Sequence, residues 1–210
     1  MTRLDLLNLI AAVTRAKTYL EVGVQGGLVF KLVNVPNRVG VDPDPRSAAT
    51  VHQTSDDYFA ALDPSVKFDL IFIDGLHLAE QVERDAANAL SHLSEDGVIV
   101  FHDCDPPNEQ AGQRDMCAGY WCGDTWKAWL KVRAVNDRQT LTVDTDLGLG
   151  VILPITVGRV ADQSCHLLSD LSWLDQPGAW STFQQNRSAL LNLVSPTAAR
   201  TWINRLARRR

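Results

Sequence analysis

Short apolar runs alternate with amphipathic stretches over the first half of the chain. The runs at 18–22, 38–41, 68–74 and 98–101 predict buried strands, with a further brief strand at 50–52. Between them, apolar residues recur at helical spacing over 4–13, 25–33, 55–62 and 78–93, where Ser55 is expected to cap the third helix and 95–97 to form a turn. Strands that alternate with helices in this way indicate a parallel sheet covered on both faces.

The pattern changes after residue 103. Residues 104–123 are rich in Pro, Asn, Gln and Gly and lack periodicity, which predicts a long loop of the kind that is more often functional than idle. A helix around 126–133 and two apolar runs at 141–143 and 149–153 follow, and these runs predict an antiparallel pair. We therefore expect an α/β, Rossmann-like, doubly wound and mostly parallel sheet over 1–160, with a C-terminal antiparallel strand. A C-terminal helical extension over 161–210 is expected to pack on the same domain.

Composition and charge narrow the class of protein. The chain has 210 residues and a net charge of −5, which argues against a nucleic-acid binder. No apolar run reaches the roughly 20 residues that span a bilayer, and the N-terminus lacks a signal-peptide core, so we expect a cytoplasmic protein without a membrane partner. The basic residues 205–210 are expected to form a solvated, frayed terminus. Free thiols are expected at all four cysteines, Cys104, Cys117, Cys122 and Cys165.

A nucleoside site is indicated where the first two predicted strands end. The first runs into Tyr19-Leu-Glu-Val-Gly-Val-Gln-Gly-Gly27, and the second ends at Asp42, whose carboxylate could accept both ribose hydroxyl protons. Glu21 lies two residues before Gly23, where a carboxylate would repel a pyrophosphate but would suit an ammonium and a sulfonium. The chain also lacks room for the second half of a dinucleotide domain. These features favour a sulfonium nucleoside over a nicotinamide dinucleotide.

Four motifs, in order, resemble those of class I S-adenosylmethionine-dependent methyltransferases. They are Glu21-Val-Gly-Val-Gln-Gly-Gly27, Gly40-Val-Asp42, Phe68-Asp-Leu-Ile-Phe-Ile-Asp74 and Gly97-Val-Ile-Val-Phe-His-Asp103. The phrases Ile73-Asp-Gly-Leu-His77 and Gly123-Asp-Thr-Trp-Lys-Ala-Trp129 resemble a bacterial O-methyltransferase branch that acts on sugars and glycosylated natural products, the macrocin O-methyltransferase type among them. The resemblance spans about 17–153. It implies S-adenosylmethionine as cofactor and a small hydroxylated acceptor.

The resemblance also implies a role for each motif residue. Glu21 and the backbone of the glycine turn would hold the methionine part of the cofactor, and Asp42 the ribose. Residues near 55 would lie beside the adenine, and Asp74 would close the site. Gly26 departs from the family pattern, in which a bulkier residue is common. The expected cofactor-binding residues are Glu21, Gly23, Gln25, Gly27, Asp42, Ser55, Asp56 and Asp74.

Polar side chains follow the predicted strands 68–74 and 98–101. The carboxyl ends of parallel strands meet at one edge of a sheet, where ligands bind, so these groups are expected to share a crevice. A histidine near its ordinary pKa of about 6.5 could take a proton from a substrate hydroxyl. The alternatives are that His77 caps the next helix and that His102 is structural. The candidate catalytic residues are His102, Asp103 and His77.

The same cluster could hold a divalent metal ion. Mg²⁺ bound by carboxylates would lower the pKa of a substrate hydroxyl and orient it, which makes Asp74 and Asp103, with His102, candidate ligands. Histidine is a less usual Mg²⁺ ligand, so a softer ion or a metal-free histidine base stays open. A zinc site is disfavoured because its candidate ligands lack paired C-x-x-C spacing; they are His102, Cys104, Cys117 and Cys122.

Two other functions remain as alternatives. An NAD(P)-dependent oxidoreductase would need a phosphate-compatible turn and a Tyr-x-x-x-Lys or similar hydride-transfer site, and neither is visible in the sequence. A non-catalytic domain that kept the nucleoside fold and binds a partner protein would not respond to S-adenosylmethionine. The sequence leaves open the acceptor, the acceptor atom and whether the chain forms a homo-oligomer.

Overall fold

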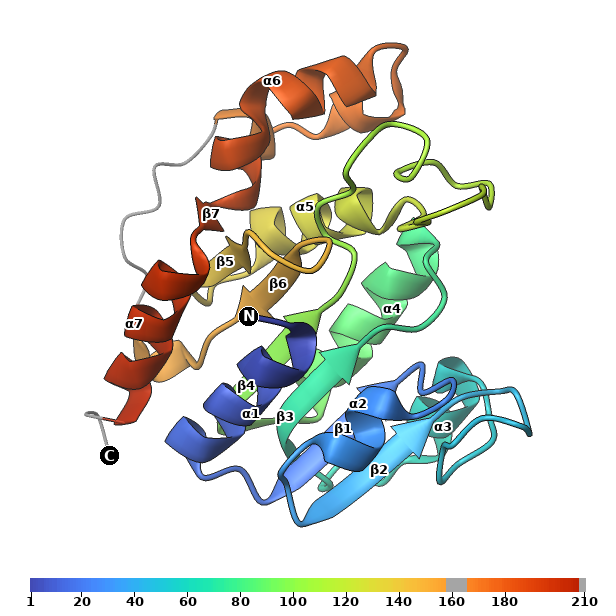
Figure 1. Cartoon of the computed structure of the whole chain (residues 1–210), viewed down its shortest axis with the longest axis vertical. Coiled ribbons are helices and arrows are strands. Elements are labelled where there is room, and N and C mark those ends of the chain that lie inside the picture. Colours follow the sequence, from blue (N-terminus) through green and yellow to red (C-terminus); the bar gives the residue numbers. More distant parts are fainter. Residues whose placement is uncertain (158–165, 208–210) are drawn as a thin grey trace.

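One seven-stranded sheet forms the centre of the computed structural model, which describes residues 1–157 and 166–207. The strands lie in the order β2-β1-β3-β4-β6-β5-β7 (Figure 1). The first four strands along the chain pair in parallel, and β6 runs antiparallel to both β4 and β5. The predicted mostly parallel sheet with an antiparallel C-terminal pair is therefore confirmed. The strands are β1 (Thr18–Val22), β2 (Asn37–Val41), β3 (Phe68–Ile73), β4 (Leu93–Phe101), β5 (Thr140–Val143), β6 (Leu149–Ile152) and β7 (Leu193–Val194).

Helices cover both faces of the sheet because its central strands are apolar on both faces. Ile71 and Ile73 pack into a core with the apolar faces of α4, α5 and α6. Leu70 and Phe72, which point the other way, pack into a second core with α1 and α7. The helices are α1 (Arg3–Thr14), α2 (Leu28–Leu32), α3 (Ser55–Ala61), α4 (Ala79–Ser91), α5 (Thr125–Val135), α6 (Ala179–Leu191) and α7 (Pro196–Leu206), with 3₁₀ turns at Ile155–Val157, His166–Leu168 and Ser172–Asp175.

The start of α1 is fixed by a capping box. The Thr2 hydroxyl accepts a hydrogen bond from the backbone N–H of Asp5 at 3.2 Å, and the Asp5 carboxylate accepts one from the N–H of Thr2 at 2.8 Å. Arg3 is consequently the first helical residue. Its side chain lies over the carboxyl ends of β3 and β4, because Nη1 donates to Asp74 and lies 3.3 Å from His102 Nδ1. The predicted leading helix is confirmed, and its first turn reaches the functional edge of the sheet.

Several predicted boundaries are wrong. The helix expected over 25–33 begins only at Leu28, because Gln25 and Gly27 have left-handed backbones and form a turn. The strand expected at 50–52 is a single bridge between Val41 and Val51. Thr54, not Ser55, caps α3 by accepting the N–H of Asp57. The turn expected at 95–97 is part of β4, which shifts its register against β3 instead.

The C-terminal part contributes a strand that the sequence did not predict. Asn192 adopts a left-handed conformation after α6, and β7 then adds to β5 in parallel. Residues 104–123 contain no helix or strand, as predicted. Cys165 and residues 208–210 of the basic tail lie outside the described residues. Within the described part of the chain, none of the helices has the length and apolarity that crossing a membrane requires.

Candidate active site

A cavity of about 490 Å³ lies at the carboxyl ends of β1 and β3. Its walls include Arg3 of α1, Glu21, the glycine turn 23–27, Asp74 and Asp146. The strand order reverses direction at β1, and ligands of open α/β sheets bind at such a switch point. A larger hollow of about 670 Å³ between α4 and α5 is lined mainly by apolar side chains and lies away from the strand ends. The polar cavity is therefore the candidate site.

Asp42 organises the glycine turn from within. Its Oδ2 accepts hydrogen bonds from the N–H groups of Val24 and Gln25 at 2.9 and 2.8 Å, and its Oδ1 accepts one from Asp44 at 2.9 Å. The N–H of Gly23 is donated to the carbonyl of Val41. Asp42 thus aligns the ends of β1 and β2. Its predicted contact with a ribose stays a prediction.

Gly23 brings the two central strands into close approach. Its φ is +87°, and a Cβ at this position would lie 2.1 Å from the carbonyl oxygen of Asp74. A Cβ at Gly26 would meet nothing within 4 Å, because this residue faces open space. The sequence therefore places glycine at 23 for a steric reason that does not hold at 26.

We expect Gly23→Ala to destabilise the fold strongly and Gly26→Ala to do so weakly. The first change combines a clash with backbone with a left-handed conformation, at a cost of roughly 2 kcal/mol or more. Urea unfolding of the two variants measures the difference. Equal stabilities of the two variants would contradict the close approach seen at Gly23.

Glu21 is buried at the base of the cavity. It is 2% exposed, and its Oε2 accepts a hydrogen bond from the Tyr19 hydroxyl at 2.5 Å. Burial raises the pKa of Glu21 to about 8; the nearby Asp74 adds to this rise, and the Tyr19 hydrogen bond opposes it. The carboxyl group is consequently protonated near neutral pH in the free protein. A cationic ligand in the cavity would favour its ionised form.

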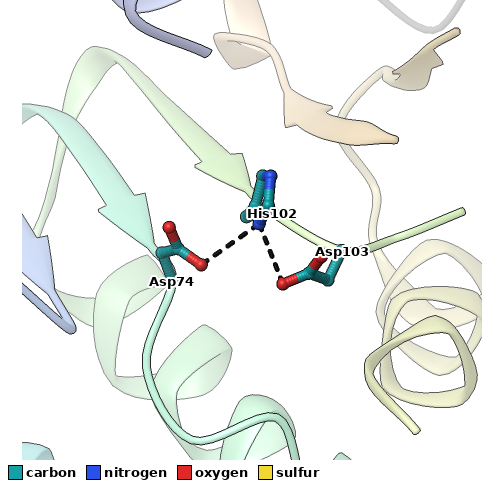
Figure 2. Close-up of side chains that lie close together, drawn as sticks. All are labelled: Asp74, His102 and Asp103. Atoms are coloured by element: carbon teal, nitrogen blue, oxygen red, sulfur yellow. Dashed lines mark ion pairs between the residues drawn. The ribbon is translucent and has the colours of Figure 1, made fainter. Parts of the chain in front are cut away.

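The polar groups after β3 and β4 meet as predicted. Figure 2 shows Asp74 and Asp103 on either side of His102, whose Nδ1 lies 3.2 Å from Asp74 Oδ1 and 2.8 Å from Asp103 Oδ2. His77 joins them through Nε2, at 3.3 Å from Asp103 Oδ2 and 3.6 Å from Asp74 Oδ1. Asp74 also lines the cavity. The predicted cofactor and catalytic groups therefore adjoin at this one residue.

Residues 20–104 match the family model described as a methyltransferase domain. This part of the chain is therefore similar to a methyltransferase domain. No curated protein is similar enough in sequence to be matched to it.

Solved structures share the fold of this chain at low sequence identity. The O-methyltransferase from Bacillus cereus in complex with SAH has a TM-score of 0.56 and 15% identity, over 72% of this chain and 80% of that chain. The O-methyltransferase TomG from Streptomyces achromogenes, involved in tomaymycin synthesis and in complex with SAM, has a TM-score of 0.53 and 17% identity, over 72% and 79%. The SAH-bound Podospora anserina methyltransferase PaMTH1 has a TM-score of 0.53 and 15% identity, over 73% of this chain and 79% of that chain.

Sequence reasoning missed two charged residues of the candidate site. Arg3 donates to Asp74 Oδ2 at 2.9 Å and, through Nε and Nη2, to the two oxygens of Asp146 at 3.2 and 3.1 Å. Asp146 lies in the turn between β5 and β6, where residues 146–148 all have positive φ. Non-glycine residues rarely adopt this conformation, and it is found mainly where a fold must place a side chain. The strained turn places Asp146 Oδ1 3.5 Å from His102 Nε2.

Interactions within the cluster shift the pKa values of several of its members. Burial lowers the pKa of His102, but its interactions with Asp103, Asp146 and Asp74 outweigh burial and raise it to about 11. Burial likewise lowers the pKa of His77, and contacts with Asp74 and Asp103 raise it overall. Burial opposes ionisation of Asp74, yet hydrogen bonds from both histidines and the charge of Arg3 hold its pKa well below its ordinary value. His102 is therefore a cation near neutral pH in the free protein, which is not the form of a general base.

The two carboxylate oxygens of Asp103 differ in their surroundings. Both histidines contact its Oδ2, whereas the buried Oδ1 makes no hydrogen bond with any described residue. The thiol of Cys122 lies beside this carboxylate, and burial, together with Asp103, raises the thiol pKa, so the thiol stays neutral. The φ of Asp103 is +59°, a left-handed conformation that Asp and Asn tolerate better than most residues.

The remaining predicted residues lie elsewhere or in other roles. Ser55 and Asp56 begin α3 and receive hydrogen bonds from Gln81, with Arg84 also on Asp56, so they contact α4 rather than the described cavity. Their proposed place beside an adenine stays a prediction. Cys104, Cys117 and Cys122 are free thiols, as predicted. The loop 104–123 reaches the site through Trp121, whose carbonyl accepts a hydrogen bond from His77 Nδ1 at 3.1 Å.

Proposed function

We propose that this chain transfers a methyl group from S-adenosylmethionine to a hydroxyl of a small polar acceptor, such as a sugar or a glycosylated natural product. The observation that carries the proposal is that Asp74 belongs to both the cavity beside the glycine turn and the buried Asp-His-Asp cluster. A methyl donor held in the cavity would lie next to groups that can take a proton. The O-methyltransferases among the structural relatives, solved with SAM or SAH, support this assignment.

The glycine turn favours S-adenosylmethionine over a nicotinamide dinucleotide. A pyrophosphate needs backbone N–H groups that point at it from a helix N-terminus. Here the N–H groups of Val24 and Gln25 are donated to Asp42, and that of Gly27 to the carbonyl of Val24. The helix that follows, α2, has only five residues. An acidic cavity in which these N–H groups are donated to the protein itself supports a ligand that carries positive charge.

Asp103 is the group that we assign to proton transfer. In the reaction the methyl carbon–sulfur bond breaks and a carbon–oxygen bond forms in line with it, while the hydroxyl proton passes to Asp103 Oδ1. His77 and His102 hold the other oxygen of this carboxylate and so orient it. Burial of the cluster removes water from the hydroxyl, and most of the rate enhancement would come from this positioning.

A divalent metal ion fits the same residues. Ligand atoms of Asp74, His102 and Asp103 lie within 4.8 Å of one another, and Asp103 Oδ1 is buried without a hydrogen-bond partner among the described residues. Carboxylate oxygens are the ligands that Mg²⁺ prefers. A bound ion would lower the pKa of a substrate hydroxyl. Transfer measured with and without EDTA distinguishes this arrangement from a metal-free site, in which activity would persist.

We expect S-adenosylhomocysteine to raise the melting temperature of the protein, since a ligand of the folded state stabilises it. In Asp42→Asn, loss of a charged acceptor for three N–H groups should weaken this binding about tenfold or more. The exposed Asp170→Asn is the matched control. A melting temperature that neither S-adenosylmethionine nor S-adenosylhomocysteine changes would favour a non-catalytic domain. Binding of S-adenosylhomocysteine to Asp42→Asn with wild-type affinity would contradict the cofactor assignment.

A further inference from the structure

Acidic side chains outnumber basic ones in the described wall of the cavity. Among the described residues of its wall, Arg3 is the one basic side chain, whereas Glu21, Asp74 and Asp146 are acidic. The methionine part of S-adenosylmethionine carries an ammonium and a sulfonium, which suit the acids, and one carboxylate, which does not. Any carboxylate bound here therefore needs a donor that overcomes the acidic wall.

The glycine turn does not supply that donor. The N–H groups of Gly23, Val24, Gln25 and Gly27 are all donated to oxygen atoms of the protein itself. The five-residue α2 is too short to act as an anion-binding helix. These four N–H groups are thus already engaged, which favours a side chain as the donor to a negative group.

Arg3 has the geometry and a spare donor for this task. A guanidinium carries five N–H groups, and among the described residues three are donated to carboxylate oxygens of Asp74 and Asp146. Nη1 also lies 3.3 Å from His102 Nδ1, whereas one N–H on Nη2 has no acceptor among the described residues, and the side chain is 29% exposed. The capping box at Thr2 and the two carboxylates fix its position, so little conformational entropy is lost when it binds a ligand.

We propose that Arg3 binds the carboxylate of the methionine moiety and makes the site selective for the complete amino-acid end of the cofactor. This inference rests on the proposed use of S-adenosylmethionine. It assigns a binding role to the first turn of α1, outside the motifs that carry the family resemblance.

The test compares S-adenosylhomocysteine with its decarboxylated analogue by isothermal titration calorimetry. We expect the wild-type protein to prefer the carboxylate form by tenfold or more, the range of a charged hydrogen bond. Arg3→Met should bring the two affinities to within about threefold of each other, and Arg3→Lys, which keeps the charge but not the planar fork, should give an intermediate preference. Lys131→Met removes a cation that pairs with Glu83 on α4 and is the charge-matched control.

Each outcome separates this inference from the proposed function. A preference that survives in Arg3→Met, or that falls equally in Lys131→Met, overturns the role of Arg3 while leaving cofactor binding intact. Wild-type protein that binds neither compound overturns both. If Arg3→Met is unfolded in circular dichroism, Arg3→Lys alone decides, and an unchanged preference in that variant counts against the carboxylate contact.

Discussion

Replacing Asp103 by asparagine should lower kcat for methyl transfer by at least about a hundredfold, the lower end of the range for a positioned acid or base. Asparagine keeps the left-handed backbone and the hydrogen bond to His102, but its amide cannot take a proton from the acceptor. Asp103 does not line the described cavity, so binding of S-adenosylhomocysteine should change by no more than about threefold.

Steady-state kinetics and calorimetry on the same preparation measure these two quantities. The exposed Asp63→Asn is the matched control, since Asp63 lies in the turn after α3. Retention of more than a fifth of the wild-type kcat would remove Asp103 from proton transfer and from metal binding alike. Loss of cofactor binding together with activity would place Asp103 in the cofactor site instead.

The stability of the free protein should fall as pH rises from about 5 to 8, and Glu21 should account for much of the fall. In the unfolded chain its carboxyl loses its proton near 4.5, whereas burial in the fold raises its pKa to about 8. Between these values the folded state binds more protons than the unfolded state, so each rise in pH favours unfolding. The shift corresponds to a loss on the order of 4–5 kcal/mol across this window.

Urea unfolding of wild type and Glu21→Gln at several pH values isolates this contribution, because the other titrating groups are common to both. The variant should lose less stability across the window, while the exposed Glu95→Gln should follow the wild type. Binding of S-adenosylmethionine at pH 7 should also release a proton, since its positive charges favour ionised Glu21. Parallel pH profiles for wild type and Glu21→Gln would show that Glu21 is not held protonated in the fold.

The sequence predicted those parts of the fold and of the site that depend on the local pattern of apolar and polar residues. Strands such as β3 are apolar on both faces only because helices cover both, so the periodicity alone revealed a parallel sheet. The cluster at Asp74 and Asp103 could be predicted because residues after neighbouring parallel strands must meet. The glycine turn after β1 was predicted as a ligand-binding segment, whereas the close approach of Gly23 to the carbonyl of Asp74 was visible only in the structure.

The features of the site that the sequence did not predict depend on contacts between distant segments of the chain. Arg3 and Asp146 are 143 positions apart, and only the packed fold brings them together beside Asp74. A capping-box pattern in the sequence predicts where α1 starts, but it does not predict which residues the first helical side chain contacts. The one signal for Asp146 was an acidic turn that ends in Gly148, which is common in hairpins. The charge of His102 was equally hidden, because it depends on three carboxylates from three elements.

The most direct test of the account is transfer of a labelled methyl group from S-adenosylmethionine to a panel of sugars, glycosides and phenols, with the product analysed by mass spectrometry and NMR. The account predicts that the label appears on an oxygen of at least one hydroxylated acceptor, and that Asp103→Asn slows this transfer by at least about a hundredfold. Label found only on nitrogen or carbon, or no transfer by a protein that binds S-adenosylhomocysteine, would contradict it.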